Sequence, residues 1–188
     1  MKKILFSLFV ITGAFTISCN SNSSSTPDGP KAADQQNDKK FDSTNMQKDA
    51  DFAVFAADGG MAEVSLGKLA ESNGSSKEVK DLAAMLVMDH EKANVELKAI
   101  AASNNITLPA GVSDKHKQKY DELSAKKGAD FDKAYLDAME DGHKATIEQF
   151  QKEADKGNNA TLKQWAIEKL PTLQHHLEAI QSYKAKMK

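Results

Sequence analysis

The stretch 80-KDLAAMLVMDHEKANVELKAI-100 decides the fold, because its apolar residues follow the period of an α-helix. They recur at alternating steps of three and four residues, at Val79, Leu82, Leu86, Ala93, Leu97 and Ile100. This spacing predicts a helix that is buried along one stripe. His90 belongs to the same stripe, four residues after Leu86 and three before Ala93. A histidine therefore interrupts an otherwise apolar seam.

Three other stretches share this period, and the four expected helices cover residues 47–72, 75–103, 130–156 and 159–186. Runs of β-branched residues with a period of two, which would indicate strands, are nearly absent. We therefore expect an all-α domain. Among the apolar residues that we place in its core are Phe55, Met88 and Met187.

Local signals mark the ends and irregularities of these helices. Ser75-Ser76-Lys77-Glu78 predicts a capping box at the start of the second helix, and Asn159 is the expected cap of the fourth. Gly59-Gly60 is poor helix material and indicates a close helix crossing or a kink. Pro171 should kink or split the fourth helix.

The connections between the helices predict how they are arranged. Tight turns at Asn73-Gly74 and Gly157-Asn158-Asn159 make antiparallel pairs of the first two and the last two helices. Segment 104–128 is far longer than the about 2 to 8 residues that usually join bundle helices, and Ser113 begins a short helix within it. We expect a ferritin-like four-helix bundle with this segment as a long crossover. An up-down-up-down bundle with a decorative short helix is the alternative.

The amino terminus has the pattern of a secretory signal. A basic start at Lys2 and Lys3 precedes the apolar run Ile4–Ile17, which is too short to span a membrane comfortably. The run ends at Thr16-Ile17-Ser18-Cys19, which resembles a bacterial lipoprotein signal, although Thr16 replaces the usual leucine. We expect residues 1–18 to be a signal peptide and Cys19 to be lipidated, with an ordinary secretory signal as the alternative.

Residues 19–46 carry few apolar side chains and are rich in Ser, Asn, Asp, Gln and Lys. Such a composition predicts a disordered tether. Residues 47–188 would then form the four-helix-bundle domain, held by its lipid to the cell envelope. The expected location is the outer membrane, facing the periplasm, with the membrane itself as a partner.

Charge and cysteine content exclude several functions. The formal net charge is −2, and all 25 basic residues are lysine, so no guanidinium group is present to read bases or clamp phosphate. We expect no nucleic-acid partner. A single cysteine, Cys19, excludes an internal disulfide and a thiolate metal cluster. The sequence identifies no protein partner, and we expect a monomer.

One polar side chain lies on or beside the inward stripe of each long helix: Glu63, His90, His143 and His176. Glu140 stands three residues before His143, the Glu-x-x-His unit of di-iron bundles. Val87 and Leu173 occupy the equivalent positions before the other two histidines, so we do not expect a standard di-iron centre.

Two interpretations of this polar layer remain open. Two or three imidazoles with a carboxylate, Glu63 or Asp89, would suit one ion of zinc, iron or copper. Alternatively, the histidines are hydrogen-bonded core residues that pair Glu63 with His143 or Asp89 with His176. We favour this second interpretation, in which no cofactor is bound. No serine or cysteine nucleophile and no phosphate-binding loop is evident, so we assign no catalytic residue and no enzymatic activity.

Three groups of residues carry a resemblance to a known family: Asp89-His90 with Asn94 and Leu97, Phe131-Asp132 with Tyr135, Met139 and His143, and Leu170-Pro171 with Leu173, His176 and Leu177. In these motifs the chain resembles domain of unknown function 4142, a family of predicted bacterial outer membrane proteins, over about residues 49–183. The resemblance implies a ferritin-like helical fold and an envelope location, and no established activity.

Our leading hypothesis from the sequence is a lipid-anchored envelope protein with a non-enzymatic role in interaction or envelope stress. The competing hypothesis is a metal-binding ferritin-like bundle that acts in storage, sensing or redox chemistry. The distance between the imidazoles of His90, His143 and His176 separates the two, because rings more than about 8 Å apart could not share one ion.

Overall fold

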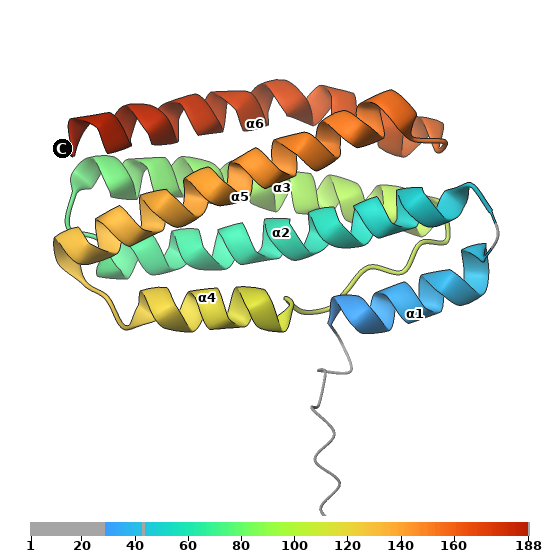
Figure 1. The fold of residues 1–188 in the computed structure, drawn as a ribbon, viewed down its shortest axis with the longest axis horizontal. Coiled ribbons are helices and arrows are strands. Elements are labelled where there is room, and N and C mark those ends of the chain that lie inside the picture. Colours follow the sequence, from blue (N-terminus) through green and yellow to red (C-terminus); the bar gives the residue numbers. More distant parts are fainter. Residues whose placement is uncertain (1–28, 43, 188) are drawn as a thin grey trace, which may run out of the picture.

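The computed structural model describes residues 29–42 and 44–187, which form six α-helices and no strand (Figure 1). The helices are α1 (Pro30–Phe41), α2 (Met46–Asn73), α3 (Lys77–Ser103), α4 (Asp114–Ser124), α5 (Gly128–Lys156) and α6 (Ala160–Lys186). The all-α class is confirmed, and the four long helices begin and end close to the predicted positions. The predicted signal peptide and Cys19 lie outside the described residues. Within the described ranges, no helix combines the length and apolar character needed to cross a bilayer.

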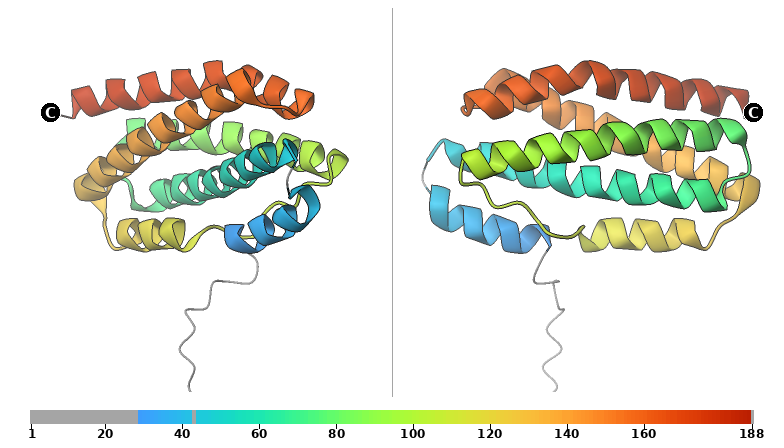
Figure 2. Two further views of the ribbon diagram at one scale, coloured as in Figure 1. Left: turned by 45° about the vertical axis from the view of Figure 1, so that its right-hand side comes forward. Right: turned by 180° about the vertical axis from the view of Figure 1, so that it is seen from behind.

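The four long helices form a bundle in which each packs against two others. α2 packs against α3 and α5, and α6 packs against α5 and α3. Figure 1 shows that α3 and α5 run in the same direction, because the connection between them returns along the bundle to the end where α3 begins. Every packed pair of long helices is therefore antiparallel. α4, which lies in this connection, and α1 lie end to end beside α2 in both Figure 1 and Figure 2.

The core has two apolar parts with a polar layer between them. One part lies toward the α5–α6 turn, where the rings of Phe52, Phe150 and Trp165 contact one another with centroids 5.0 to 6.2 Å apart. The other lies toward the α2–α3 turn and contains the stacked rings of Phe131 and Tyr135. Along all four long helices, the polar residues identified from the sequence fall between these two parts.

Side-chain caps begin three of the helices. Ser113 and Asn159 accept the backbone N–H groups of His116 and Leu162, at 3.4 and 2.9 Å, which confirms both predicted caps. At α3 the cap is Ser76. The second serine of the predicted capping box therefore performs this role, one residue later than the box implies.

Two buried aspartates, Asp49 and Asp132, each accept hydrogen bonds from the turn of the opposite helical hairpin. Asp132, near the start of α5, accepts the backbone N–H groups of Ser75 and Ser76 at 3.1 and 2.9 Å in the α2–α3 turn. Asp49, in the first turn of α2, accepts those of Asn158 and Asn159 at 3.0 and 2.7 Å in the α5–α6 turn. We call these two carboxylates the reciprocal caps.

The expectation of a disordered tether is wrong for residues 30–41, which form α1. Asn37 is fully buried, and its amide donates to the carbonyl of Thr107 at 2.9 Å and accepts its N–H at 2.8 Å. Ala33 is also buried against the bundle. Polar contacts to a segment distant in sequence hold this helix in place. Its few apolar residues therefore gave no sequence signal that it would be ordered.

Pro171 does not split α6, which is continuous from Ala160 to Lys186. Proline removes the hydrogen bond that would reach the carbonyl of Ile167, four residues earlier. Ile167 is 44 % exposed, so water can satisfy that carbonyl. The helix tolerates the proline because it faces solvent.

Three apolar residues expected in the core are exposed instead: Phe55 (39 %), Met88 (64 %) and Met187 (43 %). Met88 lies two residues after Leu86 and therefore points away from the buried stripe of α3. Met187 follows the end of α6. Phe55 of α2 lines a groove between α2, α4 and α5, which leaves part of its ring exposed.

Candidate metal centre

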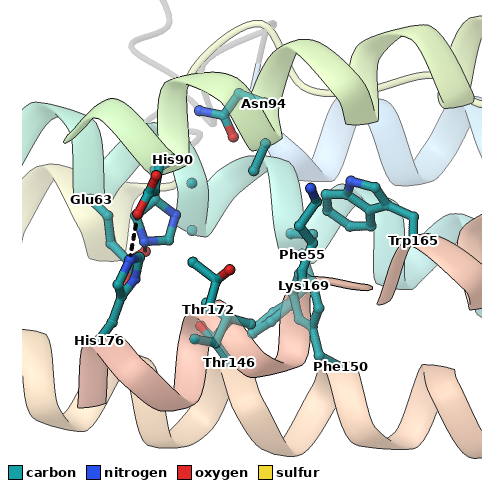
Figure 3. A pocket seen from close by; sticks show the side chains of 16 residues that line it. Phe55, Glu63, His90, Asn94, Thr146, Phe150, Trp165, Lys169, Thr172 and His176 are labelled. Atoms are coloured by element: carbon teal, nitrogen blue, oxygen red, sulfur yellow. Dashed lines mark hydrogen bonds and ion pairs between the residues drawn. The ribbon is translucent and has the colours of Figure 1, made fainter. Parts of the chain in front are cut away.

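The polar layer brings together one side chain from each long helix. Glu63, His90, His143 and His176 come from α2, α3, α5 and α6, and none is more than 7 % exposed. Figure 3 shows Glu63, His90 and His176 converging from three different helices. Each belongs to its helix's inward stripe, so the period that buries the core also brings these four side chains to one place.

The three imidazoles are close enough to share an ion. Their ring centroids are 5.3 to 5.6 Å apart, well inside the limit set above. One ring nitrogen from each lies within 4.8 Å of the others. Around a tetrahedral ion with bonds near 2.0 to 2.1 Å, ligand atoms are about 3.4 Å apart. Small side-chain movements would close this difference, with no shift of the helices.

Hydrogen bonds to other groups determine which nitrogen of each ring faces the centre. His143 Nδ1 lies 2.9 Å from the carbonyl oxygen of Met139, and His176 Nε2 lies 3.0 Å from a carboxylate oxygen of Asp89. Both oxygens accept, so these two nitrogens carry the protons. The other nitrogens, His143 Nε2 and His176 Nδ1, therefore present lone pairs, and they face each other at 3.3 Å.

His90 and Glu63 complete the layer. His90 Nε2 is 2.8 Å from Glu63 Oε2, but it is not aligned for a hydrogen bond and has no hydrogen-bond partner among the described residues. The other carboxylate oxygen of Glu63 is 3.3 Å from His143 Nδ1. One ring nitrogen from each histidine thus lies in the same small volume, and the Glu63 carboxylate lies beside it, against His90 Nε2 and His143 Nδ1.

The charge states of three of the four side chains, Glu63, His143 and His176, favour metal ligation at neutral pH. Burial raises the pKa of Glu63, but His90 and His143 outweigh it and bring the pKa down to about 2. Burial lowers the pKa of His143, and burial with the repulsion of the other histidines lowers that of His176 to about 4. Burial also opposes the charged form of His90, yet Glu63 outweighs it and raises that pKa. Glu63 is therefore a carboxylate, and His143 and His176 are neutral imidazoles, which are the forms that bind metal. His90 favours its charged form beside Glu63 and would release its proton when an ion binds.

A family model described as "Domain of unknown function (DUF4142)" matches residues 31–183. The chain belongs to this family. Among solved structures, the crystal structure of a DUF305 fragment from Deinococcus radiodurans is similar, with a TM-score of 0.66 and 11 % sequence identity. The match covers 74 % of this chain and 96 % of that chain, and it shows the fold alone. No curated protein matches.

Two other acidic residues of this DUF4142 domain were candidate ligands. Asp89 is partly exposed and holds His176 from outside the layer, as the sequence-based pairing predicted. Glu140 is not brought to the site, since its carboxylate contacts Lys144, Lys184 and Gln181. The Glu-x-x-His spacing therefore does not supply a second ligand from α5.

Sequence reasoning missed the carbonyl of Met139, because a backbone acceptor leaves no signal in residue identity. It also left open why α2 carries Gly59-Gly60. A Cβ atom on Gly60 would overlap the side-chain oxygen of Asn94, whereas one on Gly59 would meet nothing within 4 Å. Gly60 thus marks a close helix crossing, one of the two alternatives that the sequence left open, beside the candidate metal centre.

Proposed function

We propose that the domain binds one transition-metal ion through His90, His143, His176 and Glu63. The observation that carries the proposal is the pair of ring nitrogens, His143 Nε2 and His176 Nδ1, that face each other at 3.3 Å. Their rings are held by Met139 and Asp89 in the tautomers that leave both nitrogens unprotonated. Two lone pairs that face each other repel, whereas a cation bound between them would be coordinated by both nitrogens.

A proton could also occupy this position, but the lowered pKa values of both histidines argue against it. Three nitrogens and one carboxylate oxygen suit zinc, copper or iron, and lack the oxygen-rich character that magnesium or calcium requires. A buried site for one ion fits sensing or delivery better than bulk storage.

The setting that we propose for this site is the bacterial envelope. An apolar run that ends at the only cysteine, Cys19, supports a lipid anchor at the outer membrane. The single long crossover and the antiparallel packing of neighbouring helices support a ferritin-like bundle. A non-enzymatic envelope or stress role stays our proposal for the whole protein, and metal capture would be its molecular basis.

Calorimetric titration tests the metal site. Chain purified without a metal-affinity tag and treated with chelator is titrated with Zn²⁺, Cu²⁺ or Co²⁺, and we expect one tightly bound ion per chain. His176→Ala should weaken binding strongly, because it removes one of four ligands. His175→Ala is the matched control, since that neighbouring histidine is exposed.

The proposal predicts that His90→Ala and Glu63→Ala also weaken binding. Co²⁺ should give the intense visible absorption of a four-coordinate site. If wild-type protein takes up no stoichiometric metal, or if His90→Ala binds as tightly as wild type, the histidines serve the core alone and the proposal fails.

A further inference from the structure

A cavity of about 50 Å³ opens beside the metal centre (Figure 3). Glu63, His90 and His176 form one end of it, and Phe150 and Trp165 line the other. A water molecule needs about 10 to 15 Å³ by a comparable measure, so the cavity has room for a ligand of about three heavy atoms. Any such ligand would be in direct reach of an ion bound by the layer.

Each histidine-bearing helix adds one uncharged polar side chain to the wall of this cavity, which Asp89 of α3 and Lys169 of α6 also line. Asn94 follows His90 by four residues, Thr146 follows His143 by three, and Thr172 precedes His176 by four. These spacings equal one helical turn, so each polar residue lies one turn from its histidine. Figure 3 shows both threonines between His176 and Phe150.

The fourth helix contributes space instead of a side chain. One turn before Glu63, α2 carries Gly59 and Gly60, and both line the cavity. The result is a chamber with an amide, two hydroxyls, the Asp89 carboxylate and the Lys169 ammonium group in its wall, and with aromatic rings at its far end. Such a chamber suits a small ligand that accepts hydrogen bonds.

Phe55 lies between this cavity and solvent. A groove between α2, α4 and α5 is lined by Phe55, Gly59, Glu63 and Thr146, and all four also line the cavity. Lys115, Lys119 and Lys126 border the same groove, together with Asp137, Asp141 and Glu122. Phe55 is 39 % exposed although aromatic, and it stands where a ligand would pass from the groove to the metal.

We infer that the metal bound by this layer expands its coordination toward the cavity, and that a small anion of two or three heavy atoms binds there as a fifth ligand. Asn94, Thr146 and Thr172 would hold the anion as hydrogen-bond donors, and Phe55 would control its entry. This inference rests on the proposed metal site and adds the class of ligand that reaches it. Azide is a suitable probe, because it binds metals and accepts hydrogen bonds.

Azide titration of the Cu²⁺-loaded or Co²⁺-loaded full chain, followed by visible absorption, tests the inference. We expect a saturable spectral change in wild type. Thr172→Leu fills the cavity and removes a donor, so it should weaken azide binding by about tenfold or more while leaving metal affinity unchanged. Thr172→Val removes only the hydroxyl, and this variant should fold even if the bulkier Thr172→Leu variant does not. Thr161→Leu, at an exposed position of α6, should change neither.

Phe55→Ala should speed azide association without a comparable gain in equilibrium affinity. The inference is overturned if metal binds normally but azide leaves the spectrum unchanged, or if Thr172→Leu and Thr172→Val bind azide as wild type does. In both cases the metal site itself would stand. If no metal binds at all, the proposed function fails and this inference fails with it.

Discussion

At the metal centre, the groups that orient the imidazoles matter as much as the imidazoles themselves. Met139 directs His143 through a backbone carbonyl, and Asp89 directs His176 through a carboxylate. Only with these two contacts do His143 Nε2 and His176 Nδ1 both turn their lone pairs inward. Partners of this kind fix the tautomer and raise the basicity of a ligating histidine.

Asp89→Ala should therefore lower metal affinity although Asp89 is not a proposed ligand. Loss of such a partner typically costs about 10- to 100-fold in affinity. Competition titration with a chromophoric chelator measures the change. Asp81→Ala, which removes an exposed carboxylate of the same helix, serves as control. Equal affinities for the two variants would show that Asp89 does not orient His176.

Glu153 makes stability depend on pH. It is 5 % exposed, and burial with the negative charge of Asp49 raises its pKa from 4.5 to about 7, against a smaller opposing effect of Lys163. Between these values the folded protein holds a proton that the unfolded chain has released. Stability therefore falls as pH rises through this window, by about 1 to 3 kcal/mol.

Glu153→Gln should remove this dependence, because its amide can donate to Asp49 at every pH. Thermal unfolding from pH 5 to 8 compares the variant with wild type, and the difference should grow in favour of the variant toward pH 8. Glu148→Gln, at an exposed position of α5, is the control. Parallel pH profiles for wild type and Glu153→Gln would contradict the assignment.

At the residue scale, the polar layer could be predicted because Glu63, His90, His143 and His176 each lie on or beside an apolar stripe. The helical period is a strong signal, and it places such residues in the core whatever their partners are. Glu140 misled us because a spacing of three along α5 does not say which neighbouring helix a side chain meets. It lies instead among lysines of α5 and α6.

At the scale of elements, the reciprocal caps join the two hairpins more specifically than apolar packing does. Asp132 accepts two backbone N–H groups and the hydroxyl of Ser75, so one side chain satisfies the α2–α3 turn. The sequence gives little sign of this, because an acidic residue near the start of a helix is usually explained by the helix dipole. Helix bounds and caps were predictable locally, whereas these contacts between distant segments were not.

Asp132→Ala should destabilise the fold by about 1 to 3 kcal/mol, since it removes the charge-assisted hydrogen bonds that the carboxylate accepts from Ser75 and Ser76. Urea denaturation followed by circular dichroism measures the loss. Asp130→Ala removes an exposed carboxylate from the first turn of the same helix and should cost about 1 kcal/mol or less. A similar small effect of both substitutions would mean that the turn closes without Asp132.

At the scale of the whole molecule, the proposed anchor would determine where the proposed metal centre works. Wild-type protein should incorporate labelled palmitate and sediment with membranes, because several acyl chains hold a protein to a bilayer stably. Cys19→Ala should abolish the label and release the protein. Ser18→Ala, which keeps a small residue before the cysteine, should leave both unchanged. Wholly soluble wild-type protein would defeat the anchor.

The reciprocal caps also define the smallest unit that can function. An isolated α2–α3 hairpin would lack the carboxylate that closes its turn, and an isolated α5–α6 hairpin would lack its own. The proposed metal ligands are divided in the same way, with Glu63 and His90 on the first hairpin and His143 and His176 on the second. Either hairpin alone would thus lack the cap of its turn and would carry only two of the four proposed ligands. Folding and the proposed metal capture would therefore both require the complete bundle, and we expect neither from a fragment.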